Sequence, residues 1–392
     1  MNNKSLYFTL YFFEGAPIGL IWWTIPTLLS VNGIGVDVIT TILAFATLPW
    51  ALKFLLGPLA DRFLYKNNHH ALTIVSLQGL MVLTLSWIAL TGVHSKLLSL
   101  MVVLLSVCSA AQDVVIDAWA IARVEEEHRG SVNGAMQAGM LSGKWIFGPG
   151  LLIALDQVDW RWATGGLILL ICGNMSYLLL RYGRDQKVIA PVLETLSYKS
   201  LSFITKRKFL ILGVIALLSA FSLEAITGIT TPLLIKQGFI ETKVGWLLSG
   251  TLFTMLLGGL LGGKLSDKFS AKTIFFWSGL CLAPIVILVG LFDKTSAPTL
   301  LVASLYLSYA LVGAFTASSY AYYMEQAKGS MEATKFTFLM AITNLCESSS
   351  AYTTGQLAVA PGSYLKAFTV CGIISLVGLT LLKQNKLEAK HD

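Results

Sequence analysis

The stretch GPLADR at residues 57–62 returns as GKLSDK at residues 263–268, which is 206 positions further along the chain. A second pair of stretches has the same spacing, because PTLL begins at Pro26 and PLL begins at Pro232. Similar stretches at one shared offset are typical of a chain built from two structural repeats. The 392 residues are therefore expected to divide near their middle.

The composition is that of a membrane protein, since 55% of the residues are apolar and only 12% are charged. Apolar runs of about 20 residues follow one another along the chain, and each could cross a bilayer as a helix. Backbone groups in lipid must be paired within their own segment, which favours helices. We predict an all-α membrane protein with twelve transmembrane helices, at residues 5–31, 35–60, 71–92, 97–121, 131–156, 162–181, 208–236, 243–266, 272–292, 297–324, 332–358 and 363–383.

The positive charges predict the orientation of these helices. With a cytoplasmic N-terminus, six of the 28 Lys and Arg residues fall in external segments: Lys96, Arg161, Lys236, Lys243, Lys294 and Lys366. Most of the others fall in cytoplasmic segments, which is the positive-inside pattern. Both termini are therefore predicted to be cytoplasmic. The net charge of +7 reflects this topology, and we expect no nucleic-acid partner.

The longest polar stretch, residues 182–207, joins the sixth and seventh predicted helices. We therefore predict two pseudo-symmetric bundles of six helices, at residues 1–181 and 208–392, joined by a cytoplasmic linker at residues 182–207.

These motifs resemble those of a known family. GPLADR after the second predicted helix resembles the signature loop of the major facilitator superfamily. Two further stretches, YFFEGAPIGL at residues 11–20 and AQDVVIDAW at residues 111–119, look like the branch that holds AmpG-type muropeptide permeases, acetyl-CoA transporters and RhtX/FptX-type siderophore importers. The resemblance implies a multi-pass protein of the bacterial inner membrane that works by rocker-switch alternating access.

The stretch RGSVNGAMQ at residues 129–137 is more similar to the siderophore importers of this branch. We therefore predict a proton-coupled importer of a ferric siderophore or a similar medium-sized polar solute. A muropeptide permease is the close alternative. The GPG at residues 148–150 resembles an antiporter motif and would favour a multidrug or siderophore exporter. A sensor that has lost transport is a distant alternative.

Ionisable side chains at membrane depth are functional-site candidates, because each costs about 2.5–3.5 kcal/mol on insertion scales. Seven are placed there: Glu14, Lys53, Asp113, Asp117, Lys144, Glu224 and Glu347. The helical rise puts Lys53 at the depth of Glu14 and Asp117. We predict that these three form a lower layer of ion pairs.

A second layer is predicted near the midplane, where Lys144 would pair with Asp113, with Glu347 or with both. Five acids face two bases, so some carboxylates lack a cationic partner and could exchange protons. Lys144 would also offer a positive charge to an anionic or ferric-chelate substrate. Glu224 lies beyond the midplane and is a candidate for an external gate, and Gln137 is a further substrate candidate.

Aromatic and loop residues complete the candidate site. Flat rings suit a large, partly aromatic ligand, and the predicted cavity aromatics are Trp23, Trp50, Trp119, Tyr320 and Tyr323. The repeated loops predict a cytoplasmic charge latch made by Gly57, Asp61, Arg62, Asp267 and Lys268. Small residues at Gly139 and Gly143 favour a close helix–helix contact.

Several chemical motifs are absent from the sequence. No G-x-x-x-x-G-K-[ST] loop or H-E-x-x-H motif occurs. We predict a monomeric transporter rather than an enzyme, with no cofactor and no metal site. Its partners would be a small-molecule substrate, protons and the lipid bilayer.

Overall fold

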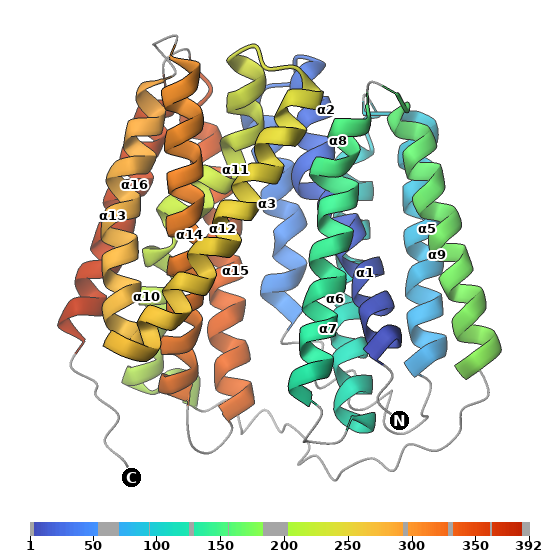
Figure 1. Cartoon of the computed structure of the whole chain (residues 1–392), viewed down its shortest axis with the longest axis horizontal. Coiled ribbons are helices and arrows are strands. Elements are labelled where there is room, and N and C mark those ends of the chain that lie inside the picture. The colour runs from blue at the N-terminus through green and yellow to red at the C-terminus, as the bar shows by residue number, and fades with distance from the viewer. Residues whose placement is uncertain are drawn as a thin grey trace. The chain divides into compact units, whose positions relative to one another are not determined.

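The computed structural model describes residues 4–53, 70–93, 95–124, 129–155, 157–182, 203–292, 297–327, 332–360 and 363–385. Within these ranges every regular element is a helix (Figure 1). The predicted all-α class is therefore confirmed for the described part of the chain. The helices group into two compact units, which are described separately.

Unit 1 contains residues 1–29, 52–199 and 241–245. Helix α1 packs along α7, while α5 packs against both α6 and α9 (Figure 1). Its elements are α1 (Lys4–Gly19), η1 (Leu20–Thr24), most of α2 (Ile25–Val31), α5 (His70–Thr91), α6 (Leu98–Arg123), α7 (Arg129–Trp145), η5 (Ile146–Gly150), α8 (Leu151–Ala154) and α9 (Trp160–Tyr182).

Glycines on α7 explain how closely it approaches α1. A Cβ added at Gly139 would overlap the carbonyl oxygen of Phe8, and one added at Gly143 would overlap that of Phe12. The backbones of the two helices therefore touch, which only glycine permits at these positions. The close contact predicted at this pair is confirmed.

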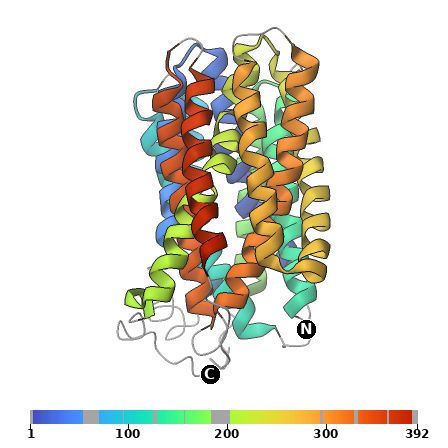
Figure 2. The same ribbon diagram turned by 90° about the vertical axis from the view of Figure 1, so that its left-hand side faces the viewer.

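Unit 2 contains residues 30–51, 200–240 and 246–392. Helix α13 packs against α14 and α16 (Figure 2), and α10 packs against α15 and α16. Its elements are α3 (Val36–Leu52), α10 (Arg207–Ser219), α11 (Phe221–Lys236), most of α12 (Glu241–Phe269), α13 (Ala271–Leu291), α14 (Pro298–Ala327), α15 (Glu332–Leu357) and α16 (Tyr364–Gln384).

Helix α3 comes from the first half of the sequence but packs in unit 2, on α15. The Ser348 hydroxyl donates to the carbonyl of Ala44 at 2.7 Å, and the Asn344 amide donates to the carbonyl of Trp50 at 3.2 Å. The two units therefore do not follow the order of the sequence. The division at residues 181 and 207 remains a prediction.

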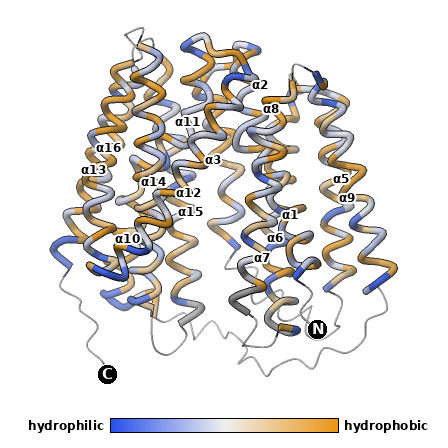
Figure 3. The backbone as a smooth tube through the Cα atoms, in the orientation of Figure 1, coloured by the Kyte–Doolittle hydropathy of each residue, from blue (hydrophilic) through white to orange (hydrophobic). Residues whose placement is uncertain are grey.

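Nine helices in the described ranges are long and apolar enough to cross a membrane, and Val36–Leu52 is a shorter apolar helix. Hydrophobic residues run along the lengths of the helices, and hydrophilic residues gather near their ends (Figure 3). Large apolar side chains face outward, as Leu180 does with 90% of its surface exposed. The chain is therefore a multi-pass membrane protein. The count of twelve spans and the cytoplasmic termini remain predictions.

Three predicted helices are not continuous α-helices. The helix predicted at residues 208–236 is interrupted at Ala220, whose φ and ψ of −90° and 0° separate α10 from α11. The first and fifth predicted helices each contain a five-residue π-helical segment, η1 and η5. Such segments are frequent at functional sites, and η1 contacts η5.

Candidate functional site

A partly buried ion pair joins the residue after α3 to α6 within unit 1. The Nζ atom of Lys53 donates to Oδ2 of Asp113 at 2.8 Å, and the exposed fractions of the two side chains are 25% and 7%. Lys53 was expected to pair with Glu14 and Asp117, and Lys144 with Asp113, with Glu347 or with both. The structure instead gives Lys53 a direct ion pair with Asp113, and the pairing of Lys144 remains a prediction.

Tyr11 of α1 connects the two aspartates of α6. Its hydroxyl lies 3.2 Å from Oδ1 of Asp113 and 2.5 Å from Oδ1 of Asp117. Asp113 and Asp117 are four residues apart and so present their carboxyl groups on one face of the helix, as expected. One phenol oxygen can therefore reach both carboxyl groups.

Glu14 lies one turn beyond Tyr11 on α1 and is wholly buried. Neither of its carboxyl oxygens has a hydrogen-bond partner among the described residues. It interacts electrostatically with Asp113, Asp117, Lys53 and, more weakly, Lys144. Three acids of unit 1 thus gather around Lys53, and Asp113 is the one that forms its ion pair. We name Tyr11, Glu14, Lys53, Asp113 and Asp117 the acid cluster.

Lys144 and Gln137 both lie on α7 but in different surroundings. Lys144 is half-buried, and a Cβ added at Gly19 would overlap its carbonyl oxygen, so the backbone of α7 touches α1 there. Gln137 is exposed. The structure therefore brings the backbone near Lys144 against α1, and it leaves the side chain of Gln137 on the surface of unit 1.

Two of the predicted acids lie in unit 2. Glu224 of α11 and Glu347 of α15 are both partly buried and interact electrostatically with each other. The Ser350 hydroxyl donates to the carbonyl of Phe221 at 2.9 Å, which fixes these two helices together one turn from each acid. Lys144 belongs to unit 1, so its pairing with Glu347 remains a prediction.

The predicted cavity aromatics differ in burial. Trp119 is 2% exposed, stacks on His70 and meets the edge of Tyr182, while Tyr323 is 1% exposed and packs against Phe275. Both therefore contribute to helix packing inside their units. Trp23 and Trp50 are partly buried and Tyr320 is 39% exposed. A role of any of the five in binding remains a prediction.

The predicted latch is only partly visible. Gly57, Asp61 and Arg62 lie outside the described residues. Asp267 and Lys268 are exposed near the end of α12, and the Lys268 ammonium lies 5.2 Å from the centre of the Phe269 ring. The charge latch therefore remains a prediction.

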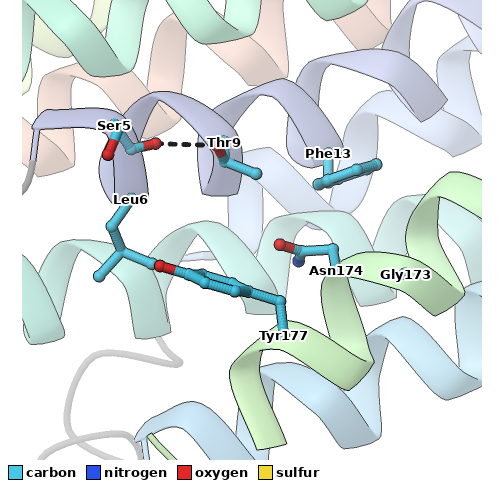
Figure 4. Close-up of a pocket in the computed structure, with 7 residues that line it drawn as sticks. All are labelled: Ser5, Leu6, Thr9, Phe13, Gly173, Asn174 and Tyr177. Atoms are coloured by element: carbon cyan, nitrogen blue, oxygen red, sulfur yellow. Dashed lines mark hydrogen bonds between the residues drawn. The ribbon is translucent and has the colours of Figure 1, made fainter. Parts of the chain in front are cut away.

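A cavity of about 320 Å³ lies between α1 and α9 (Figure 4). Asn174 is buried at its wall, and the amide of Asn174 donates to Oε1 of Gln78 on α5 at 3.0 Å. The other atoms of the cavity wall come from Ser5, Leu6, Thr9, Phe13, Gly173 and Tyr177. None of the acid cluster lines this cavity, so the two features are distinct.

A family model matches nearly the whole length of the chain. The family model described as Major Facilitator Superfamily matches residues 6–240 and 214–391. The chain belongs to the major facilitator superfamily. It is therefore a transporter of this superfamily, and the predicted resemblance is confirmed.

Curated relatives fall in the AmpG branch of the superfamily. The chain is 24% identical to the putative transporter AmpG 4 of Rickettsia felis over 278 residues, which cover 67% of each chain. It is 25% identical to the anhydromuropeptide permease of Escherichia coli over 292 residues. That match covers 70% of this chain and 58% of the permease. The predicted resemblance to this branch is thus supported by relatives along much of the chain.

The fold of this superfamily transporter is shared with solved structures. A point mutant of the nucleoside transporter NupG superposes with a TM-score of 0.76 at 14% identity, covering 97% of this chain and 99% of NupG. At this identity the likeness concerns the fold alone.

Tyr11 is the member of the acid cluster that sequence reasoning missed. It lies three residues before Glu14, so the two residues share a face of α1. A phenol placed one turn from a buried acid is the signal that could have identified it.

Proposed function

We propose that this superfamily transporter couples the movement of a medium-sized polar solute to protons and imports it across the bacterial inner membrane. The observation that carries the proposal is the acid cluster, in which Glu14, Asp113 and Asp117 gather around Lys53. Several ionised carboxylates at one buried place repel one another and are poorly solvated. Binding a proton at this cluster therefore removes an unfavourable charge.

Coupling requires that the proton affects which way the transporter opens. The cluster joins Lys53, the residue that follows α3, to α1 and α6 through Tyr11 and Asp113. A proton that changes these bonds would bias one arrangement of the helices over another, which is what alternating access by a rocker switch requires.

Two substrate classes are candidates. The stretch at residues 129–137 favours a ferric siderophore, whereas the AmpG relatives favour an anhydromuropeptide. Both are polar solutes of medium size, and either could use the positive charge of Lys144. Export remains the alternative favoured by the GPG at residues 148–150.

The test is uptake by the purified full-length protein in liposomes that contain a pH-sensitive dye. An anhydromuropeptide, a ferric hydroxamate and a ferric catecholate are each offered outside, with and without an imposed proton gradient. We expect one of them to enter together with protons. Uptake that ignores the gradient would contradict proton coupling. Solute movement against the proton flow would indicate export, and no movement of any solute would favour a sensor.

A further inference from the structure

The hydroxyl group of Tyr11 cannot donate a hydrogen bond to both aspartates at once. A phenol carries one hydrogen and can donate it to one carboxylate at a time. Its oxygen nevertheless lies within bonding distance of both Asp113 and Asp117. The second contact is satisfied when the other carboxyl group is protonated and donates its own hydrogen to the phenol oxygen.

The ion pair decides which aspartate carries that hydrogen. Lys53 donates to Oδ2 of Asp113 at 2.8 Å, so Asp113 is the acceptor of a salt bridge. Asp117 has no salt bridge among the described residues. The hydrogen bonds then run in one direction. Asp117 donates to the oxygen of Tyr11, Tyr11 donates to Oδ1 of Asp113, and Lys53 donates to Oδ2.

Asp117 is more exposed to solvent than the other two acids of the cluster. Glu14 and Asp113 are buried, whereas Asp117 is only partly buried. A group that exchanges protons with water must be reached by water. Among the three acids of the cluster, Asp117 best meets that condition.

On the basis of the proposed proton coupling, we propose that Asp117 is the carboxyl group that binds the transported proton. Tyr11 is a positioning residue: its hydrogen bonds change with the protonation of Asp117, and this change alters the Asp113–Lys53 ion pair. Three charged or titratable groups act on Asp117: Asp113 on the same helix, Tyr11 on α1, and Lys53. Glu14 on α1 also interacts electrostatically with Asp117.

The step conserves every proton. When Asp117 loses its proton to water, its O–H bond breaks and the carboxylate becomes an acceptor only. The hydrogen of Tyr11 then rotates from Asp113 to Asp117, without leaving the phenol oxygen. Asp113 loses one donor and depends on Lys53 alone. The ionisation of Asp117 thereby changes the hydrogen bonding of the Asp113–Lys53 ion pair.

Infrared spectroscopy of the purified full-length protein tests this assignment directly, because a protonated carboxylic acid has its own C=O stretching band. We expect one such band to appear and disappear above about pH 6, where the exposed Asp and Glu side chains are already ionised. Asp117→Asn should abolish it, while Glu14→Gln should leave it. Tyr11→Phe should keep the band but move its midpoint by about one pH unit, since a hydrogen-bond partner of the carboxyl group is lost. A titrating band that survives Asp117→Asn, or a midpoint unmoved in Tyr11→Phe, would overturn the assignment.

The spectrum requires no transport, so the two proposals can fail separately. If the band behaves as expected and uptake ignores the proton gradient, the assignment of Asp117 stands and the proposed coupling fails. If uptake is proton-driven but the titrating band belongs to Glu14, the coupling stands and the assignment fails. Should Asp117→Asn not fold, Tyr11→Phe alone decides, because the phenol hydroxyl can be removed without adding volume.

Discussion

The ammonium of Lys53 lies 2.8 Å from Oδ2 of Asp113, although 60 residues separate them in the sequence. The pair ties the segment after α3 to the middle of α6. Both side chains are largely buried, so each charge depends on the other for solvation. We therefore expect this pair to stabilise the acid cluster.

Replacing only one partner of the ion pair should lower the stability of the protein more than replacing both. Lys53→Met keeps the apolar stem but leaves Asp113 as an uncompensated buried charge, and we expect the stability to fall by about 3 kcal/mol. Lys53→Met combined with Asp113→Asn leaves no buried charge at either position and should recover most of this loss. Thermal unfolding in detergent, followed by size-exclusion chromatography, measures both. Equal losses in the single and double variants would contradict the explanation.

The contact between α1 and α7 should depend on particular glycines. Gly139→Ala would place a methyl group on the backbone carbonyl of Phe8 in α1. The helices would have to separate, and we expect a loss of about 1–3 kcal/mol. Gly134→Ala on the same helix is the matched control, since a Cβ there has no heavy atom within 4 Å. It should be neutral or stabilising by up to about 1 kcal/mol. The idea fails if both variants unfold at the same temperature.

The sequence predicts the helices and the gathering of acids well, but not which groups pair. Apolar runs mark the helices, and depth along a helix places Lys53 level with Glu14 and Asp117, one turn from Asp113. These aspartates are four residues apart, which is about 6 Å along the axis. A lysine side chain is about as long as this, so depth alone cannot choose between the two partners.

Other features have no signal in the sequence. The interruption at Ala220 has neither Gly nor Pro beside it, and the carbonyls of Ser219 and Phe221 accept hydrogen bonds there from Ser375 and Ser350. The packing of α3 in unit 2 likewise comes from contacts more than 290 positions apart in sequence, such as that between Trp50 and Asn344. Local pattern cannot reveal such contacts.

The hydrogen bond between Asn174 and Gln78 should stabilise α5 against α9. Asn174→Leu removes the donor and leaves Oε1 of Gln78 buried without it, so we expect a loss of about 1–2 kcal/mol. In the double variant with Gln78→Leu neither buried amide remains, and the loss should be smaller. Unfolding temperatures in detergent give the comparison. A double variant less stable than Asn174→Leu would show that the hydrogen bond is not the cause.

Thr24 should hold the π-helical segment η5 in place. The N–H of Leu151 bonds to the carbonyl of Gly148, which is one residue later in the chain than Phe147, the usual acceptor in an α-helix. The hydroxyl of Thr24, at a wholly buried position on η1, donates to the carbonyl of Phe147 at 2.7 Å. Thr24→Val keeps the shape but removes this donor, and we expect the stability to fall by about 1–2 kcal/mol.

Thr27→Val is the matched control for this bond. Thr27 of α2 is also wholly buried on the same transmembrane segment, but its hydroxyl donates at 2.7 Å to the carbonyl of Trp23, four residues earlier in that segment. That carbonyl lies four residues earlier, where the backbone N–H of a helix normally bonds, so Thr27→Val should cost less than about 0.5 kcal/mol. If η1 and η5 move during transport, Thr24→Val should also change the uptake rate more than Thr27→Val does. Equal effects of the two valines on unfolding temperature and on uptake would mean that the bond from Thr24 to Phe147 does not restrain η5.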